Sequence, residues 1–262
     1  MDENGTRQAR EQVVVKRNDL IQKTRHEYTL QEQRAMQYVI SLVKPGDTSF
    51  CEYVIRISDF LDICGIYDKG GKAHQELKDT LKKMADKSYW YMLPDGKETL
   101  IRWFTHVTIN HQEGTFALKL HEDLVPYLVQ LKNNYTQYEL KYILAMRSRY
   151  SMRLYEILKS NVYKGTPITF ELGNLKKIID AETHKTYNNF QRKVLDYAKA
   201  EICELTDITF EYEQVKTGRK VTALTFHIAQ KADLGERLDA WTAIENRLAR
   251  KKARKNPQAA ET

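Results

Sequence analysis

The chain has 262 residues, of which 42% are hydrophobic, so it can bury a core and is not an intrinsically disordered chain. Its net charge of +7 attracts polyanions, and no segment approaches the roughly 20 apolar residues that a membrane span needs. Cys51, Cys64 and Cys203 form no CxxC motif, which argues against a disulfide framework or a zinc site and favours the cytoplasm. We therefore expect no membrane partner, no metal and no cofactor.

The positive charge is unevenly distributed along the chain. From Arg247 to the end there are six Lys or Arg residues and one acid, which leaves a net charge of only about +2 for the rest. Segment 141–164 holds six basic residues and one acid, whereas segment 201–213 holds five acids and no base. A nucleic-acid surface on the body therefore requires segregated charge, and the basic tail is either a non-specific polyanion contact or a solubilising end.

The first half of the chain predicts an arm followed by alternating helices and strands. Residues 1–25 are largely polar and basic with a short Val13-Val14-Val15 run, and we interpret them as a loose arm with one short strand. Thr29 and Glu32 form a capping box that begins the first helix. After it we expect a strand over 51–57, a short helix over 58–64, a longer helix over 72–87 with Leu77, Leu81 and Met84 as its apolar stripe, and strands over 89–93, 100–109 and 116–120.

The second half repeats the same order of elements. We expect a helix over 149–160, a strand over 168–172, a short helix over 173–179, a helix over 183–202, and strands over 208–212 and 224–228. Tyr38 corresponds to Tyr155, Ile57 to Leu172, Ile63 to Ile178 and Leu77 to Phe190, at an offset near 115 residues. Helix, strand, short helix, long helix and hairpin is the order of a winged helix-turn-helix.

The predicted fold is therefore α+β, with two tandem winged helix-turn-helix domains. We place a basic N-terminal arm at 1–25, an N-terminal winged-helix domain at 26–122, a connector at 123–147, a C-terminal winged-helix domain at 148–231, and a C-terminal helix with a basic tail at 232–262. The connector is apolar between Leu124 and Val129, and a flexible linker would be richer in Gly and Ser. We expect it to be packed and to fix the two halves relative to each other.

The helix expected over 183–202 is the main candidate for reading DNA. Phe190, Val194, Tyr197 and Ala198 form one apolar stripe. The opposite face carries side chains that can hydrogen-bond to base edges and phosphates, namely Lys185, Thr186, Tyr187, Asn189, Arg192 and Lys193. Such a face is commonly just solvated surface, but the matching helix of the first half favours DNA binding. Its outward face carries Lys72, His74, Gln75, Lys78 and Lys82.

Further basic residues are candidates for contacts to the DNA backbone. Three of them flank the turn of the second hairpin, where a wing would touch phosphate: Lys216, Arg219 and Lys220. Arg149 and Arg153 lie four residues apart on one helical face and could hold phosphate. Arg153 could equally pair with Glu156, and the sequence leaves both interpretations open.

A block near the middle of the chain resembles a known family. It consists of Tyr127-Leu128 and then Ser148-Arg149-Tyr150-Ser151-Met152-Arg153-Leu154-Tyr155-Glu156-Ile157-Leu158-Lys159. This block resembles the central motif of the replication initiator proteins of iteron-containing, theta-replicating bacterial plasmids. The segments Thr29-Leu30-Gln31-Glu32-Gln33-Arg34 and Phe116-Ala117-Leu118-Lys119-Leu120 resemble that family too. The resemblance extends over residues 13 to 230 and so leaves out the basic tail.

The resemblance implies two winged helices with pseudo-two-fold symmetry. It implies that monomers bind direct repeats of the origin in double-stranded DNA, with both third helices in successive major grooves of one repeat. It further implies melting of adjacent AT-rich DNA, recruitment of the host initiator and the host replicative helicase, and autorepression with copy control by homodimers formed through the N-terminal half. The location would be the bacterial cytoplasm, in association with the nucleoid or a plasmid.

Two other classes of function compete with this interpretation. A rolling-circle nickase would need a metal-binding His pair separated by one apolar residue, but His106 and His111 lie five apart on a predicted hairpin and His227 is alone. Gly70-Gly71-Lys72 lacks the spacing of an ATP-binding Walker loop. We therefore expect no enzyme activity, whereas composition and pattern do not exclude a plain winged-helix transcriptional regulator.

Overall fold

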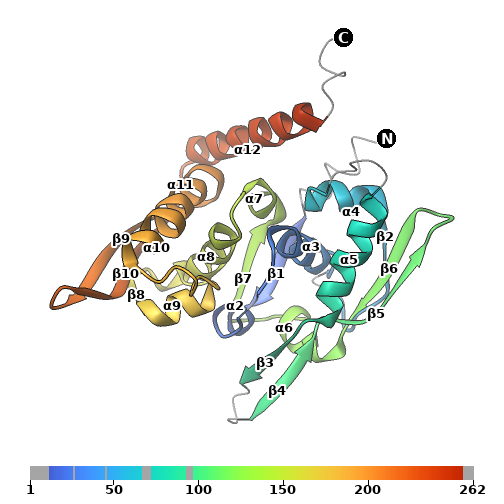
Figure 1. The fold of residues 1–262 in the computed structure, drawn as a ribbon, viewed down its shortest axis with the longest axis horizontal. Helices are drawn as coiled ribbons and strands as arrows, with labels where there is room; N and C mark the ends of the chain where they lie inside the picture. Colours follow the sequence, from blue (N-terminus) through green and yellow to red (C-terminus); the bar gives the residue numbers. More distant parts are fainter. Residues whose placement is uncertain (1–11, 26, 45, 67–71, 93–96, 256–262) are drawn as a thin grey trace. The chain divides into compact units, whose positions relative to one another are not determined.

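The computed structural model describes residues 12–25, 27–44, 46–66, 72–92 and 97–255 (Figure 1). The chain divides into two compact units. The first comprises Met1–Thr24 and Tyr28–Leu144, and the second comprises Arg25–Glu27 and Ala145–Thr262. Both units combine helices with small antiparallel sheets, which confirms the α+β prediction.

The first unit packs three helices beside a three-stranded sheet. Its elements are β1 (Val13–Arg17), α2 (Asn18–Gln22), α3 (Leu30–Ser41), β2 (Tyr53–Arg56), α4 (Ile57–Cys64), α5 (Ala73–Asp86), β3 (Ser88–Met92), β4 (Glu98–Arg102), β5 (Phe104–Asn110), β6 (Thr115–Leu120), η1 (Glu122–Leu124), α6 (Val125–Leu128), β7 (Tyr135–Glu139) and, at its end, α7 (Leu140–Ala145). Helices α3, α4 and α5 pack against one another. Strands β2, β6 and β5 form one sheet in that order, while β1 pairs with β7 and β3 with β4.

The second unit repeats this core. Its elements are α8 (Arg149–Lys159), η2 (Val162–Lys164), β8 (Ile168–Glu171), α9 (Leu172–Ile178), α10 (Tyr187–Phe190), the π-helical turn η3 (Gln191–Leu195), α11 (Asp196–Leu205), β9 (Ile208–Thr217), β10 (Lys220–Gln230) and α12 (Leu234–Lys255). Strands β8, β10 and β9 form its sheet in that order. Helix α11 packs against α8 on one side and α12 on another (Figure 1).

The duplication inferred from the sequence is confirmed by the topology. Both β8 and α9 begin 115 residues after β2 and α4, and in each sheet the last strand of the hairpin lies in the centre. The paired positions Leu77 and Phe190 are both fully buried. Two pairs are less exact. Leu172 is half-buried where Ile57 is buried, and Ile178 is half-buried because its neighbour Ile179 enters the core instead. Each unit is therefore one helix-turn-helix with a hairpin wing.

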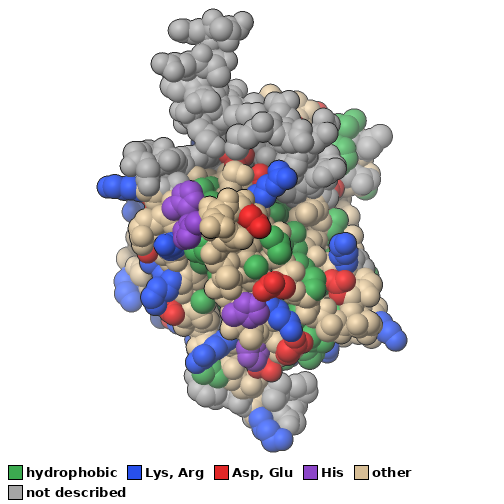
Figure 2. Space-filling view, turned by 90° about the vertical axis from the view of Figure 1, so that its right-hand side faces the viewer, with side chains coloured by type: hydrophobic (Ala, Val, Ile, Leu, Met, Phe, Trp, Pro, Cys, Tyr) green, Lys and Arg blue, Asp and Glu red, His purple; other side chains and the backbone are tan. Residues whose placement is uncertain are grey.

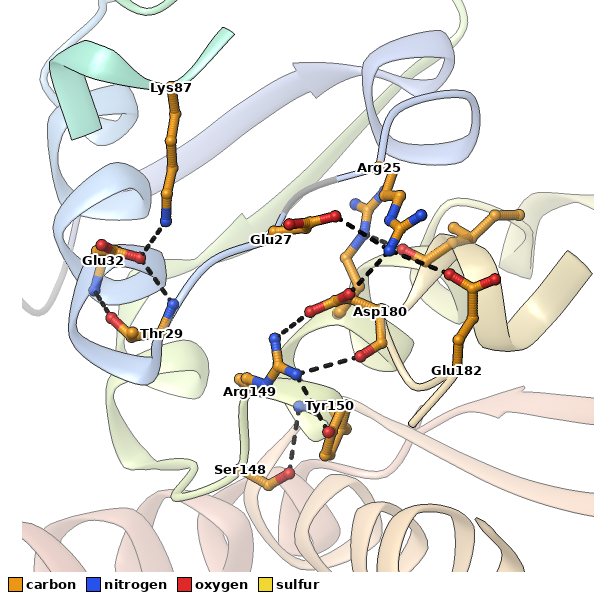
Figure 3. Close-up of polar contacts among 12 residues, drawn as sticks. Arg25, Glu27, Thr29, Glu32, Lys87, Ser148, Arg149, Tyr150, Asp180 and Glu182 are labelled. Atoms are coloured by element: carbon orange, nitrogen blue, oxygen red, sulfur yellow. Dashed lines mark hydrogen bonds and ion pairs between the residues drawn. The ribbon is translucent and has the colours of Figure 1, made fainter. Parts of the chain in front are cut away.

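The predicted capping box begins α3 of the first unit. The amide of Glu32 donates to the Thr29 hydroxyl at 3.3 Å, and the Thr29 amide donates to the Glu32 carboxylate at 2.8 Å (Figure 3). Lys87, which follows α5, places its ammonium 2.6 Å from the same buried carboxylate. These contacts tie the start of α3 to the end of the first unit's recognition helix.

The short strand expected in the N-terminal arm is present as β1, but the expectation that the arm is loose is wrong for residues 12–24. Val14 and Ile21 are fully buried, and β1 pairs with β7 from Val13 opposite Glu139 to Arg17 opposite Tyr135. Lys16 is also buried and donates to the Gln37 side chain at 3.0 Å. The remainder of the predicted arm, residues 1–11, lies outside the described residues.

Part of the predicted connector belongs to the first unit. Leu124, Leu128 and Val129 are buried, as their apolar character suggested, and β7 follows them in the sheet with β1. The strand expected over 100–109 is also divided, because β4 pairs with β3 whereas β5 pairs with β6. The break falls at Trp103, whose side chain is buried.

Candidate nucleic-acid interface

Helix α5 presents a polar face to solvent in the first unit. Its stripe of Leu77, Leu81 and Met84 is buried with at most 3% exposure. The residues predicted to touch DNA are all exposed: Lys72, His74, Gln75, Lys78 and Lys82. The predicted helix over 72–87 is therefore confirmed within one residue at each end, and it is amphipathic in the expected sense.

The charges on α5 largely balance one another. The helix therefore lacks the cationic face that we expected from its sequence. Gln75 donates to Asp79 at 2.9 Å, and the Lys82 ammonium lies 2.5 Å from Asp86. The helix carries three lysines and three acids. The face that Figure 2 shows, on the side where β5 and β6 lie in Figure 1, likewise intersperses both signs of charge. The exposed face of α5 therefore offers polar groups and little net charge.

The turn between β5 and β6 lies beside the start of α5. The imidazole rings of His74 and His111 have centroids 6.2 Å apart, and both residues are exposed. The Asn110 side chain accepts from the amides of Gln112 and Glu113, which orders this turn. His111 was considered in the sequence only as a metal ligand, and its position beside His74 required the fold.

The second recognition helix begins later than the sequence predicted. Residues 183–186 are not helical, because the Thr186 hydroxyl accepts from the Asn189 amide at 3.3 Å and caps α10. The Tyr187 hydroxyl oxygen is buried, and this burial raises the pKa of Tyr187. Thr186 and Tyr187 therefore have structural roles here, while Lys185 immediately before the cap is exposed.

The π-helical turn η3 carries two exposed basic residues of this helix. Within η3, Val194 and Leu195 are buried, whereas Arg192 and Lys193 are exposed. Together with Lys185 they give segment 185–193 a charge of +3 with no acid. The Tyr197 of the predicted stripe is instead 43% exposed. Asn188, which the periodicity did not select, is more exposed than the predicted Asn189.

Electrostatics around this helix show that the basic side chains converge. Burial together with the charges of Lys193, Lys176 and Arg149 lowers the pKa of His184. His184 lies in the turn just before α10, so the cationic groups act on one small region. Such a region favours a phosphate oxygen, since a helix N-terminus also offers amide donors to an anion.

The wing of the second unit extends beyond its sheet. Strand β8 pairs with β10 only from Ala223 to Phe226, so the hairpin from 216 to 222 continues as a two-stranded ribbon. Gly218 adopts a φ of 61° at the two-residue turn, a conformation that favours glycine. Residues 213–220 are all exposed, including the predicted wing contacts Lys216, Arg219 and Lys220.

Arg149, which stays partly exposed, makes an intramolecular network around Asp180, and its predicted phosphate contact stays a prediction. Its guanidinium pairs with the Asp180 carboxylate and donates to the Asp180 carbonyl and the Tyr150 hydroxyl, both at 3.1 Å (Figure 3). Burial opposes its charge, but these hydrogen bonds prevail and raise the pKa of Arg149. Arg25 reaches the same carboxylate at 3.3 Å and pairs with Glu182 at 3.0 Å. These contacts hold the turn that leads to α10.

The prediction of a phosphate contact for Arg153 is wrong. Its side chain is 3% exposed, and a guanidinium nitrogen lies 3.6 Å from the equally buried Glu156 carboxylate. Arg153 also donates to the Ile178 carbonyl at 3.4 Å. Of the two interpretations that the sequence left open, the structure selects the ion pair, because DNA cannot reach a side chain buried in the core.

The remaining residues of the block also hold the second unit together. The Ser148 hydroxyl accepts from the Tyr150 and Ser151 amides and caps α8. The buried Glu201 of α11 accepts from the amides of Arg147 and Ser148, and its other partner is Arg247 of α12 at 2.6 Å. The block is thus a packing motif that supports the recognition helix.

Two family models match this chain. A model described as "Initiator Replication protein, WH1" matches residues 13–159, which is more than half of the chain, and "Initiator Rep protein, WH2" matches residues 171–228. The chain belongs to the initiator replication protein family. Its two halves are the family's two winged-helix domains, in the order that the duplicated topology indicates.

Individual relatives support the same fold. The "PI protein" of Escherichia coli is 30% identical over 152 residues, which cover 51% of this chain and about half, 49%, of that relative. A crystal structure of the Pi initiator protein in complex with iteron DNA matches with a TM-score of 0.66 at 20% identity, covering 86% of this chain and 99% of that one. At this identity the structural match establishes the tandem winged-helix fold.

The described residues lack two other kinds of feature. They contain no cluster of three or more His, Cys, Asp or Glu side chains arranged to hold a metal ion. No helix among them is both long enough and apolar enough to cross a bilayer.

Proposed function

We propose that this protein initiates plasmid replication by binding double-stranded DNA at iterons, the direct repeats of a replication origin. Family membership and the similarity to an initiator solved with iteron DNA support this proposal. The observation that carries it is the duplication: each unit buries the apolar stripe of its recognition helix and exposes the polar face. An α-helix of this kind fits the major groove of B-DNA.

We assign the base contacts of the second unit to two residues at the start of its recognition helix, the exposed Arg192 and the half-buried Asn189. Arg192 can bind guanine with two hydrogen bonds, and Asn189 can do the same with adenine. Lys185 and Lys193 supply positive charge beside them. The first unit would read bases through His74, Gln75 and Lys78. Helix α5 itself is neutral, and Lys72 and Lys82 would contact the DNA backbone.

The wing of the second unit would contact the phosphate backbone. Lys216, Arg219 and Lys220 flank an exposed turn on a ribbon that projects beyond its sheet. Contacts of this kind add affinity and fix the register on the duplex without reading sequence. Their contribution should fall steeply as the salt concentration rises.

The test is a binding titration with the direct repeats that flank this gene on its plasmid. The full chain should protect each repeat in a footprint and should bind a repeat duplex at least about 10³-fold more tightly than a scrambled duplex of equal length. Protection of a single promoter palindrome, with the tandem repeats left bare, would favour a transcriptional regulator instead. Equal affinity for both duplexes would refute sequence-specific binding.

We further propose the family's downstream steps for this chain: opening of adjacent AT-rich DNA, recruitment of the host initiator and replicative helicase, and autorepression by a homodimer formed through the first unit. Each has a direct assay. Permanganate reactivity reports opening, helicase pull-down reports recruitment, and sedimentation with the intact chain reports dimers. The chain should form no covalent tyrosyl-DNA product with Mg²⁺ or Mn²⁺, and such a product would favour the nickase interpretation.

A further inference from the structure

Lys176 of α9 reaches from one helix of the second unit to the segment that precedes the next. Its ammonium donates to the carbonyl of His184 at 2.7 Å and, at 3.5 Å, to the carbonyl of Lys185. The same nitrogen lies 5.1 Å from the centre of the fully buried Phe190 ring. One side chain therefore connects the turn before the recognition helix to the core beneath that helix.

The two carbonyls held by Lys176 belong to the last residues before the helix cap. Lys185 is followed directly by Thr186, whose hydroxyl caps α10. The position of this short segment therefore sets where the helix begins and where the Lys185 side chain leaves the backbone. A shift there would move Lys185 relative to Arg192 and Lys193, which follow on the same helix.

The beginning of the same turn is held separately by other elements. Asp180, at a φ of 55°, is paired with Arg149, and the Tyr150 ring packs edge-on against the His184 ring at 5.5 Å. The Ala181 amide donates to the Lys176 carbonyl at 2.7 Å. Lys176 thus contributes through its backbone to the beginning of the turn and through its ammonium to the end.

The ammonium is retained at this place at an electrostatic cost. Burial and the nearby charge of Lys185 lower the pKa of Lys176. Two carbonyl acceptors and an aromatic face offset that cost, since charge-assisted hydrogen bonds are stronger than neutral ones. A side chain needed only for solubility would not be placed against a like charge and a buried ring.

We propose that Lys176 is a positioning residue for DNA recognition, which fixes the entry of the second recognition helix so that Lys185, Arg192 and Lys193 address one repeat together. This inference rests on the proposed function. The Lys176 ammonium is engaged by protein carbonyls in this arrangement, so its loss should reduce specificity and leave the electrostatic attraction to any duplex nearly intact.

The test compares Lys176→Met with Lys177→Met in the full chain. Both variants remove one positive charge from neighbouring positions of α9, but Lys177 is exposed and its side chain points to solvent. Met retains most of the stem that packs on Phe190. Dissociation constants are measured on a repeat duplex and a scrambled duplex over a series of salt concentrations, below the unfolding temperature of each variant. Lys176→Arg keeps the charge and serves as the rescue.

Lys176→Met should weaken binding to the repeat about tenfold while changing binding to the scrambled duplex no more than Lys177→Met does. Lys176→Arg should recover most of the loss, and the salt dependence should stay that of Lys177→Met. Equal losses on both duplexes, or equal behaviour of the two Met variants, would overturn the positioning role. A wild-type chain that fails to distinguish the duplexes would refute the proposed function instead.

Discussion

Replacing Arg153 by Met should destabilise the second unit without weakening DNA recognition by its folded form. The Arg153 and Glu156 side chains are 3% and 4% exposed, and their charged atoms lie 3.6 Å apart. At an effective dielectric constant of about 20, the attraction at that distance is about 4–5 kcal/mol. Removing one partner of a buried pair typically costs about 3–5 kcal/mol, because the other charge stays buried. The separation is long for an ion pair, so we expect a loss of about 3 kcal/mol.

Native-state hydrogen exchange is the appropriate assay, since a chain of two units need not unfold in one step. The slowest amides of α8 and α11 should exchange about 100-fold faster in Arg153→Met, which is the rate equivalent of that free energy. Lys164→Met is the matched control, because Lys164 is exposed in the same unit and its replacement removes the same charge. Its exchange should be unchanged.

A phosphate-binding role for Arg153 predicts the opposite result, namely unchanged stability and weaker DNA binding. If Arg153 held a phosphate, the Met variant would keep the exchange rates of the wild type. It would instead lose affinity on every duplex, and its salt dependence would fall by about one counterion. That outcome would contradict the burial on which our assignment of the block to packing depends.

Three further substitutions test the assignments around the second recognition helix. Arg192→Ala should weaken binding to the repeat by about 1–3 kcal/mol and binding to scrambled DNA less, and equal losses in a titration would place Arg192 on phosphate. Joint replacement of Lys216, Arg219 and Lys220 by Gln should lower the slope of log affinity against log salt by up to about 2.7, while an unchanged slope would remove the wing from the interface. Thr186→Ala should cost about 1 kcal/mol through the lost cap of α10, measured by hydrogen exchange, whereas Thr186→Ser should retain the wild-type rates.

Much of the fold could be predicted because its patterns are local. Helical and strand periodicity, the capping box at Thr29 and Glu32, and the constant offset between the halves all follow from short-range physics. The balanced charge of α5 was also present in the sequence, since Lys82 and Asp86 lie four residues apart.

Other features depend on partners distant in the chain. The first strand is ordered by β7, more than a hundred residues later, so nothing in residues 12–24 reveals its burial. The burial of Arg153 likewise depends on the packing of α8, whereas its sequence spacing allowed both phosphate and Glu156. The tertiary structure thus selected one of two interpretations of Arg153 that the local sequence pattern supported equally.

The exposure of the predicted site residues follows the sequence pattern for some of them and departs from it for others. Exposed Arg192 and Lys193 lie on the helical face expected for DNA, but Thr186 caps the start of the helix and the Tyr187 hydroxyl oxygen is buried. A π-helical turn changes the spacing of side chains in the middle of this helix, and no residue pattern in the sequence indicated it. The role of Lys176 required the contacts themselves.

We propose that each unit places its recognition helix in a major groove of the same DNA repeat. Methylation interference on a duplex with a single repeat tests it, because methyl groups at guanine N7 block the major groove. We predict two clusters of interference about 10 base pairs apart, one lost in Arg192→Ala and the other in a Gln75→Ala, Lys78→Ala variant. A single cluster, or the loss of both clusters in either variant, would contradict the account.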